Sequence, residues 1–94
     1  MAVCRIFDVP EATLEQYDQV AAKLGPESGP NKPAGAIFHV AGHTGKGLMV
    51  IEVWESPEDA DRYAEERLGA AMQEFDLPEP QITEFEVHNT DWQG

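Results

Sequence analysis

Residues 48–59 read LMVIEVWESPED, and this stretch decides the fold. Its first seven residues are apolar at both alternating positions apart from Glu52, a pattern typical of a strand with both faces covered. Ser56 and Pro57, followed by two carboxylates, then favour a helix start, because a hydroxyl can cap the free amides and negative charge suits the positive end of a helix dipole. A covered strand therefore leads directly into a helix.

The flanking sequence completes the order β-α-β-β-α-β. Thr13 and Gln16 have the spacing of a capping box, and the glycines of residues 42–47 favour a hairpin. Gly69 interrupts the apolar stripe of the second helix, which predicts a kink or a close approach there. The order predicts the ferredoxin-like split βαβ arrangement, an α+β fold with one antiparallel sheet and both helices on a single face. Strands are expected at residues 2–9, 36–41, 48–55 and 81–88, and helices at residues 14–24 and 57–75.

The chain is expected to form one domain, residues 1–94, and to dimerise. Because the helices would cover only one face of the sheet, the apolar second face of residues 48–54 needs another cover. A chain of 94 residues buries only about 60–65% of its unfolded surface on its own, so a partner subunit would add stability. We therefore expect a homodimer that packs sheet against sheet.

The charge balance excludes several classes of partner. Six Lys and Arg stand against 18 Asp and Glu, which gives a net charge of −12 and repels the phosphates of nucleic acids and anionic membranes. The longest apolar run is too short to span a bilayer. The one cysteine, Cys4, can form neither an internal disulfide nor a cysteine zinc cage. With no apolar signal segment at the start of the chain, a cytoplasmic location is expected.

Three motifs carry a resemblance to known proteins: VIEVWESPE at residues 50–58, HVAGHT at 39–44 and VHN at 87–89. The chain resembles the dimeric α/β-barrel superfamily, and more narrowly the small antibiotic-biosynthesis-monooxygenase-like proteins common in actinobacteria. The resemblance implies a pocket lined by Trp54 and cofactor-independent oxygenation of an apolar aromatic or polyketide-like compound. Haem-degrading relatives need a histidine early in the second helix and an asparagine on the first strand. This chain lacks both, so haem degradation is not expected. The resemblance then implies an enzyme that uses no cofactor.

His39 and Glu52 are the candidate catalytic residues. If Gly42 and Gly47 close the hairpin, His39 lies opposite Val50, and strand alternation places His39 and Glu52 on the same face as Trp54. The same register places Ile37 opposite Glu52. An imidazole beside a carboxylate suits proton transfer near neutral pH. The alternative is a buried structural histidine, and a one-residue bulge would separate the pair.

Trp54, Phe7 and Tyr63 are the candidate substrate-binding residues, as apolar walls of a pocket. The alternative for Trp54 and Tyr63 is plain core packing. Arg5 is expected to form an ion pair with Glu84 or Glu86 on the last strand, in preference to binding a substrate carboxylate.

Two further features of the sequence concern a metal site and a long loop. His88 could join His39 or Glu52 around a metal, but no short-spaced ligand motif supports such a site, so none is expected. Residues 25–33 contain three prolines and two glycines and form either a plain connector or a lid.

Two functions remain open from the sequence. One is a monooxygenase-like enzyme or ligand-handling protein that acts on a small apolar compound, and the other is a non-catalytic homodimer that binds a ligand or a protein. A cavity that reaches His39 would favour the first function, whereas a closely packed face would favour the second.

Overall fold

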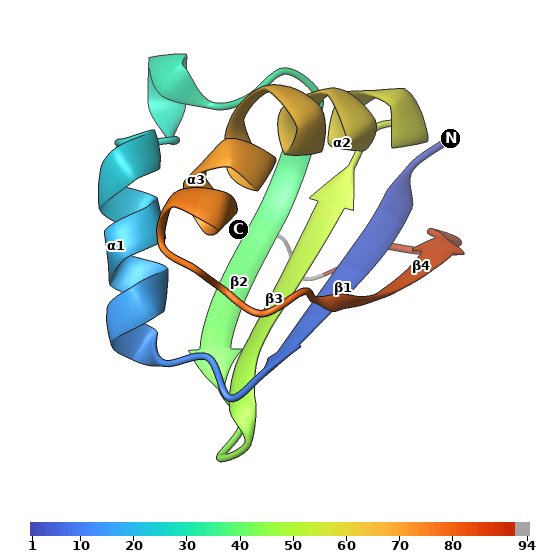
Figure 1. Ribbon diagram of the computed structural model, residues 1–94. Helices are drawn as coiled ribbons and strands as arrows, with labels where there is room; N and C mark the ends of the chain where they lie inside the picture. The colour runs from blue at the N-terminus through green and yellow to red at the C-terminus, as the bar shows by residue number, and fades with distance from the viewer. Residues whose placement is uncertain (92–94) are drawn as a thin grey trace.

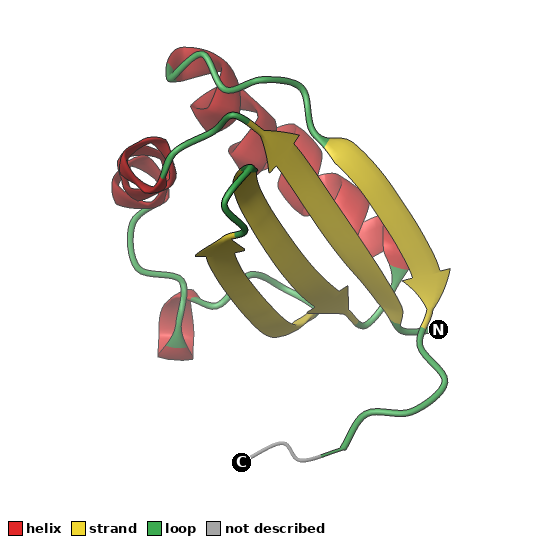
Figure 2. Ribbon diagram, turned by 90° about the horizontal axis from the view of Figure 1, so that it is seen from below, coloured by secondary structure: helices red, strands yellow, loops and turns green. Residues whose placement is uncertain are grey.

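Four antiparallel strands form one sheet in the computed structural model, which describes residues 1–91. Figure 1 shows the helices gathered on one side of this sheet, and Figure 2 shows the strands as a single twisted layer. The strand order β2-β3-β1-β4 and the element order confirm the expected ferredoxin-like α+β fold. The strands are β1 (Val3–Pro10), β2 (Ala36–His43), β3 (Gly47–Trp54) and β4 (Gln81–Glu86), and the helical elements are α1 (Leu14–Leu24), η1 (Gly29–Asn31), α2 (Pro57–Tyr63), η2 (Ala64–Leu68) and α3 (Gly69–Glu74).

Both helices begin where the sequence predicts. The hydroxyl of Thr13 accepts a hydrogen bond from the Gln16 amide at 3.1 Å, and the Gln16 side chain accepts one from the Thr13 amide at 2.9 Å. This reciprocal pair completes the capping box of α1. Ser56 caps α2 through its hydroxyl, which accepts a hydrogen bond from the Asp59 amide at 3.2 Å.

The sequence predicted one helix over residues 57–75, whereas the structure interrupts this helix with the wide turn η2. The amide of Gly69 donates to the carbonyl of Ala64, five residues earlier, which is the hydrogen bond of a π-turn. A Cβ atom at Gly69 would lie 3.0 Å from that carbonyl oxygen. Gly69 therefore makes the close approach expected at this point, and the π-turn follows Tyr63 directly.

The β2–β3 register differs from the expected one by two residues. His39 pairs with Glu52 rather than with Val50, and Glu52 does not pair with Ile37, so both expected pairings are wrong. The ladder extends to His43, and the turn closes beyond it through the Thr44 amide and the Gly47 carbonyl at 2.9 Å. Gly45 makes this tight turn with a φ of +94°, a conformation that suits glycine.

The shift leaves the candidate residues on one face, because a slip of two residues preserves strand alternation. A bulge does occur in β2, between Ala36 and Phe38. It lies beyond His39 on the side away from the turn, so His39 and Glu52 remain directly paired.

The two faces of the sheet differ in character. Beneath the helices, Val3 and Trp54 pack with Ala60 and Tyr63 of α2, and Val9 packs in a second cluster. No helix among residues 1–91 covers the opposite face, where two of the register rows that cross all four strands are uncharged. These rows, called here the open face, are Phe38–Val53–Cys4–Phe85 and Val40–Ile51–Ile6–Thr83. Among residues 1–91, no helix is long and apolar enough to cross a membrane.

Candidate functional site

A row of ionisable residues crosses the helix-covered face of the sheet. His39 of β2 pairs with Glu52 of β3, Glu52 with Arg5 of β1, and Arg5 with Glu84 of β4. Directly opposite residues in antiparallel strands have their Cβ atoms about 4.5–5.5 Å apart, so neighbours in this row interact. The register therefore surrounds one buried carboxylate with two basic groups.

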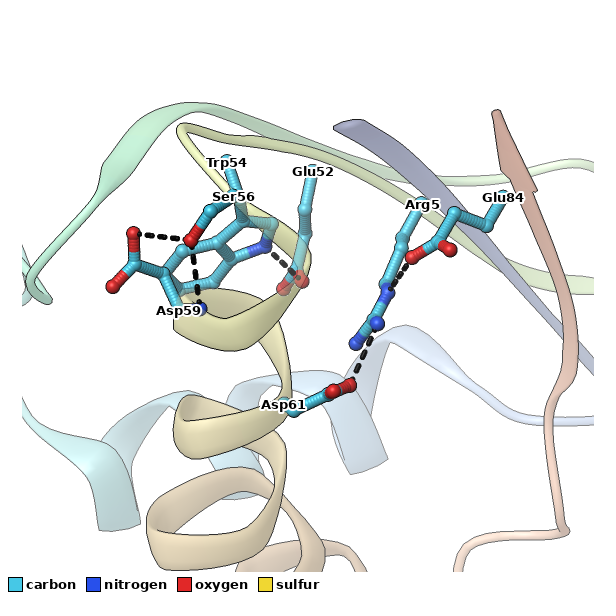
Figure 3. Close-up of polar contacts among 7 residues, drawn as sticks. All are labelled: Arg5, Glu52, Trp54, Ser56, Asp59, Asp61 and Glu84. Carbon is cyan, nitrogen blue, oxygen red and sulfur yellow. Dashed lines mark hydrogen bonds and ion pairs between the residues drawn. The ribbon is translucent and has the colours of Figure 1, made fainter. Parts of the chain in front are cut away.

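Glu52 is that buried carboxylate, with 6% of its surface exposed. The indole Nε1 of Trp54 donates to its Oε1 at 3.0 Å, as Figure 3 shows. Burial raises the pKa of Glu52, while the Trp54 hydrogen bond and the nearby His39 and Arg5 oppose that shift. Glu52 consequently holds a proton more readily than a glutamate in water.

Arg5 is held on the other side of the row by two carboxylates. Its Nε donates to Glu84 at 2.5 Å, the partner expected from the sequence, and a terminal nitrogen donates to Asp61 of α2 at 2.7 Å (Figure 3). The guanidinium is thus committed to structural ion pairs that join β1 to β4 and α2. This arrangement gives no support to a role for Arg5 in binding a substrate carboxylate.

A cavity of about 300 Å³ lies between the sheet and the helices. Its volume is at the lower end of the range for small-molecule sites. Of the five residues predicted for the site, the wall contains His39, Glu52, Phe7 and Tyr63. Most of the remaining wall is apolar and comes from β1, β3, α1, the second helix and the segment that follows it, including Val9, Val20, Leu24, Leu48, Val50, Leu68, Met72 and Leu77.

Trp54 does not line this main cavity. It is 3% exposed, and its ring packs against that of Tyr63 with centroids 5.1 Å apart. It does border a second cavity of about 250 Å³ beneath residues 28–33, which shares His39, Glu52 and Tyr63 with the main cavity. Trp54 is therefore a core residue that also positions Glu52 through its indole.

His39 is exposed in the chain and lines both cavities. Its ring stacks on that of Tyr17 from α1, with centroids 6.4 Å apart and an interplanar angle of 19°. The alternative of a buried structural histidine is therefore wrong, because this imidazole lies at the boundary between the cavities and solvent. Its location allows exchange of protons with both.

Glu27 is the site residue that sequence reasoning missed. The Tyr63 hydroxyl donates to its Oε1 at 2.7 Å, and Arg67 lies 3.4 Å from its Oε2. Arg67 also donates to the Leu24 carbonyl at 2.7 Å, so it joins the second helix to the end of α1. Burial and the Glu27 carboxylate raise the pKa of Tyr63. Glu27 lines both cavities, and its only sequence signal was the unusual length of the loop that carries it.

His88 takes no part in the cavities. It follows β4 as an exposed residue and lies in the wall of neither. Within the described part of the chain, no three His, Cys, Asp or Glu side chains are placed to hold a metal ion.

No family model matches the chain, and no curated protein matches it. Its similarity is to solved structures that share the fold. A candidate antibiotic biosynthesis monooxygenase from Chloroflexus aurantiacus has a TM-score of 0.69 at 19% identity, with 100% of both chains covered. The monooxygenase ActVA-Orf6 of Streptomyces coelicolor, in complex with nanaomycin D, has a TM-score of 0.61 at 14% identity, with coverage of 99% of this chain and 92% of that one. SnoaB, a cofactor-independent oxygenase from Streptomyces nogalater, has a TM-score of 0.58 at 13% identity, with coverage of 98% and 96%.

These similarities cover almost the whole chain and agree with the fold that the sequence motifs implied. At identities of this size they show the fold and not the reaction, because one fold can host many functions. They do not bear on the kind of organism that the chain comes from. The structural neighbours are therefore antibiotic-biosynthesis-monooxygenase-like proteins, some of them cofactor-independent.

Proposed function

We propose that this protein is a small-molecule enzyme of the monooxygenase-like kind, which acts without a cofactor on an apolar aromatic or polyketide-like compound. The observation that carries the proposal is an apolar cavity whose wall contains the paired His39 and Glu52. The cofactor-independent oxygenase SnoaB and the nanaomycin D complex of ActVA-Orf6 add support through the shared fold.

In this proposal His39 is the proton acceptor. It is open to solvent, so it can release the proton after it has taken it from the substrate. Glu52 lies directly opposite, and its negative form would stabilise a protonated imidazole. The deprotonated substrate would itself reduce dioxygen, so the protein has to supply a position and a base. Phe7 and Tyr63 would hold the ring system, and Trp54 would hold Glu52.

We further propose that the chain acts as a homodimer formed through the open face. Phe38 and Phe85 are 52% and 51% exposed at its two edges, although both are large apolar side chains. Two chains of net charge −12 repel each other wherever carboxylates meet, whereas both rows of the open face are uncharged. A second copy of the chain is therefore the occupant that this face favours, in a single-domain dimer that we expect in the cytoplasm.

The test of catalysis is oxygen uptake with a panel of reduced hydroxyaromatic and quinone-like compounds. A substrate should be consumed by the wild type, and His39→Ala should lower turnover by about 10²–10⁴-fold, the usual contribution of a positioned base. His88→Ala is the matched control, because it removes an exposed histidine outside both cavities. Binding of a compound without any turnover would instead favour the non-catalytic ligand-binding module.

A further inference from the structure

The two cavities share a pair of carboxylates that come from different parts of the chain. Glu52 projects from β3, and Glu27 comes from the loop that follows α1. Both line the main cavity and the second cavity, and each raises the pKa of Tyr63. No lysine or arginine lies in the wall of the main cavity, as far as the chain is described, so His39 is its basic group.

The Glu27 carboxylate has an acceptor oxygen without a hydrogen bond. Tyr63 donates to its Oε1, but its Oε2 is buried and has no hydrogen-bond partner. Arg67 lies 3.4 Å from that oxygen and supplies charge without a hydrogen bond. The Glu27 carboxylate therefore adds negative potential to the walls of both cavities.

Glu52 is the second carboxylate in the walls of the two cavities, and it too can accept a hydrogen bond. The indole of Trp54 donates to one of its two oxygens. Arg5 is turned toward Glu84 and Asp61, so it does not neutralise the cavity side of Glu52 by direct contact. The net charge of −12 adds a negative potential around the whole molecule, which opposes the entry of an anion.

We infer that the main cavity selects its ligand by charge. It binds an apolar ring system that carries a hydrogen-bond donor, either a neutral hydroxyl or a protonated amine. It excludes the same ring system when that ring carries a carboxylate. The inference rests on the proposed function, because it assigns the substrate class of that same site. Glu27 and Glu52 are the residues that enforce it. A carboxylate between them would meet like charges.

Three probes with one ring system separate these alternatives. They are 2-naphthol, 2-(aminomethyl)naphthalene and 2-naphthoate, measured by isothermal titration calorimetry near neutral pH. The naphthol and the amine should bind at least about tenfold more tightly than the naphthoate, because a hydrogen bond to a charged group contributes that much or more. Naphthoate that binds as tightly as the other two would overturn the inference and leave the proposed function standing. Failure of all three to bind would overturn both.

Variants locate the effect in the cavity. Glu27→Gln removes the charge and keeps the size of the side chain, and it should reduce the tenfold preference to about twofold or less. Glu79→Gln is the control, because it makes the same change in net charge at an exposed residue outside both cavities. If the two variants reduce the preference equally, net charge and not the cavity selects the ligand, and the inference is wrong. Glu52→Gln repeats the test from β3 should Glu27→Gln not fold.

Discussion

Glu52 lies directly opposite His39 in the β2–β3 ladder, while the indole of Trp54 donates to the carboxylate of Glu52 at 3.0 Å. The strand register therefore supplies the proximity of acid and base, and a core tryptophan supplies the orientation. Burial raises the pKa of Glu52, which connects the same pair to the stability of the fold.

The raised pKa of Glu52 predicts how stability changes with pH. A carboxyl whose folded pKa lies above its unfolded value of 4.5 stabilises the protein fully below that value, and this contribution is lost as the pH rises through the folded pKa. The Glu52→Gln variant cannot ionise at this position. Its free energy of unfolding should therefore increase relative to that of the wild type as the pH rises from about 4 to about 8. Urea unfolding of both proteins across this range measures the difference. If the difference in unfolding free energy stays constant with pH, or changes in the opposite direction, then the folded protein does not raise the pKa of Glu52.

The hydrogen bond between Tyr63 and Glu27 predicts a role for the loop. Tyr63→Phe keeps the ring against Trp54 but removes the donor to Glu27, so it should cost about 1.5–3 kcal/mol of stability, the usual range for a hydrogen bond to a charged group. Amide hydrogen exchange should speed up in residues 25–33 more than in the strands. Equal acceleration throughout the chain would mean that the hydrogen bond does not hold the loop locally.

The open face predicts where a charge would break a dimer. Ile51→Asp and Val53→Asp each place a carboxylate in one of its two uncharged rows, so each should shift sedimentation from a dimer to a monomer. Ala22→Asp adds the same charge to an exposed residue of α1 and should leave the dimer intact. A wild type that sediments as a folded monomer at micromolar concentration would contradict the dimer itself.

The sequence predicted the elements well because each one carries a local signal. The capping box of Thr13 and Gln16 and the Ser56 cap are contacts within four residues, and both formed as expected. The topology predicted that Arg5 pairs with Glu84 or Glu86, because β1 and β4 are neighbours, and the register selects Glu84. Strand alternation likewise kept His39 and Glu52 on one face even though the register was wrong.

The remaining features depend on geometry that no short motif records. The register error arose because the hairpin closes through Gly47 and the amide of Thr44, two residues tighter than the expected closure at Gly42. Glu27 lies in a loop without periodicity, so nothing in the sequence indicated that it would meet Tyr63 across the cavity. The sequence predicted a kink or a close approach at Gly69 but not a π-turn, since one extra residue in a helix leaves the apolar stripe nearly unchanged.

The most direct test of the central claim is to map a bound ligand by nuclear magnetic resonance. Titration of the labelled protein with 2-naphthol should shift the imidazole signals of His39 and the ring signals of Tyr17, which line the cavity between the sheet and the helices. The ring of Phe85 on the open face, which lines neither cavity, should remain unchanged. Shifts confined to Phe85, or no shifts at all, would contradict a ligand site beside His39 and Glu52.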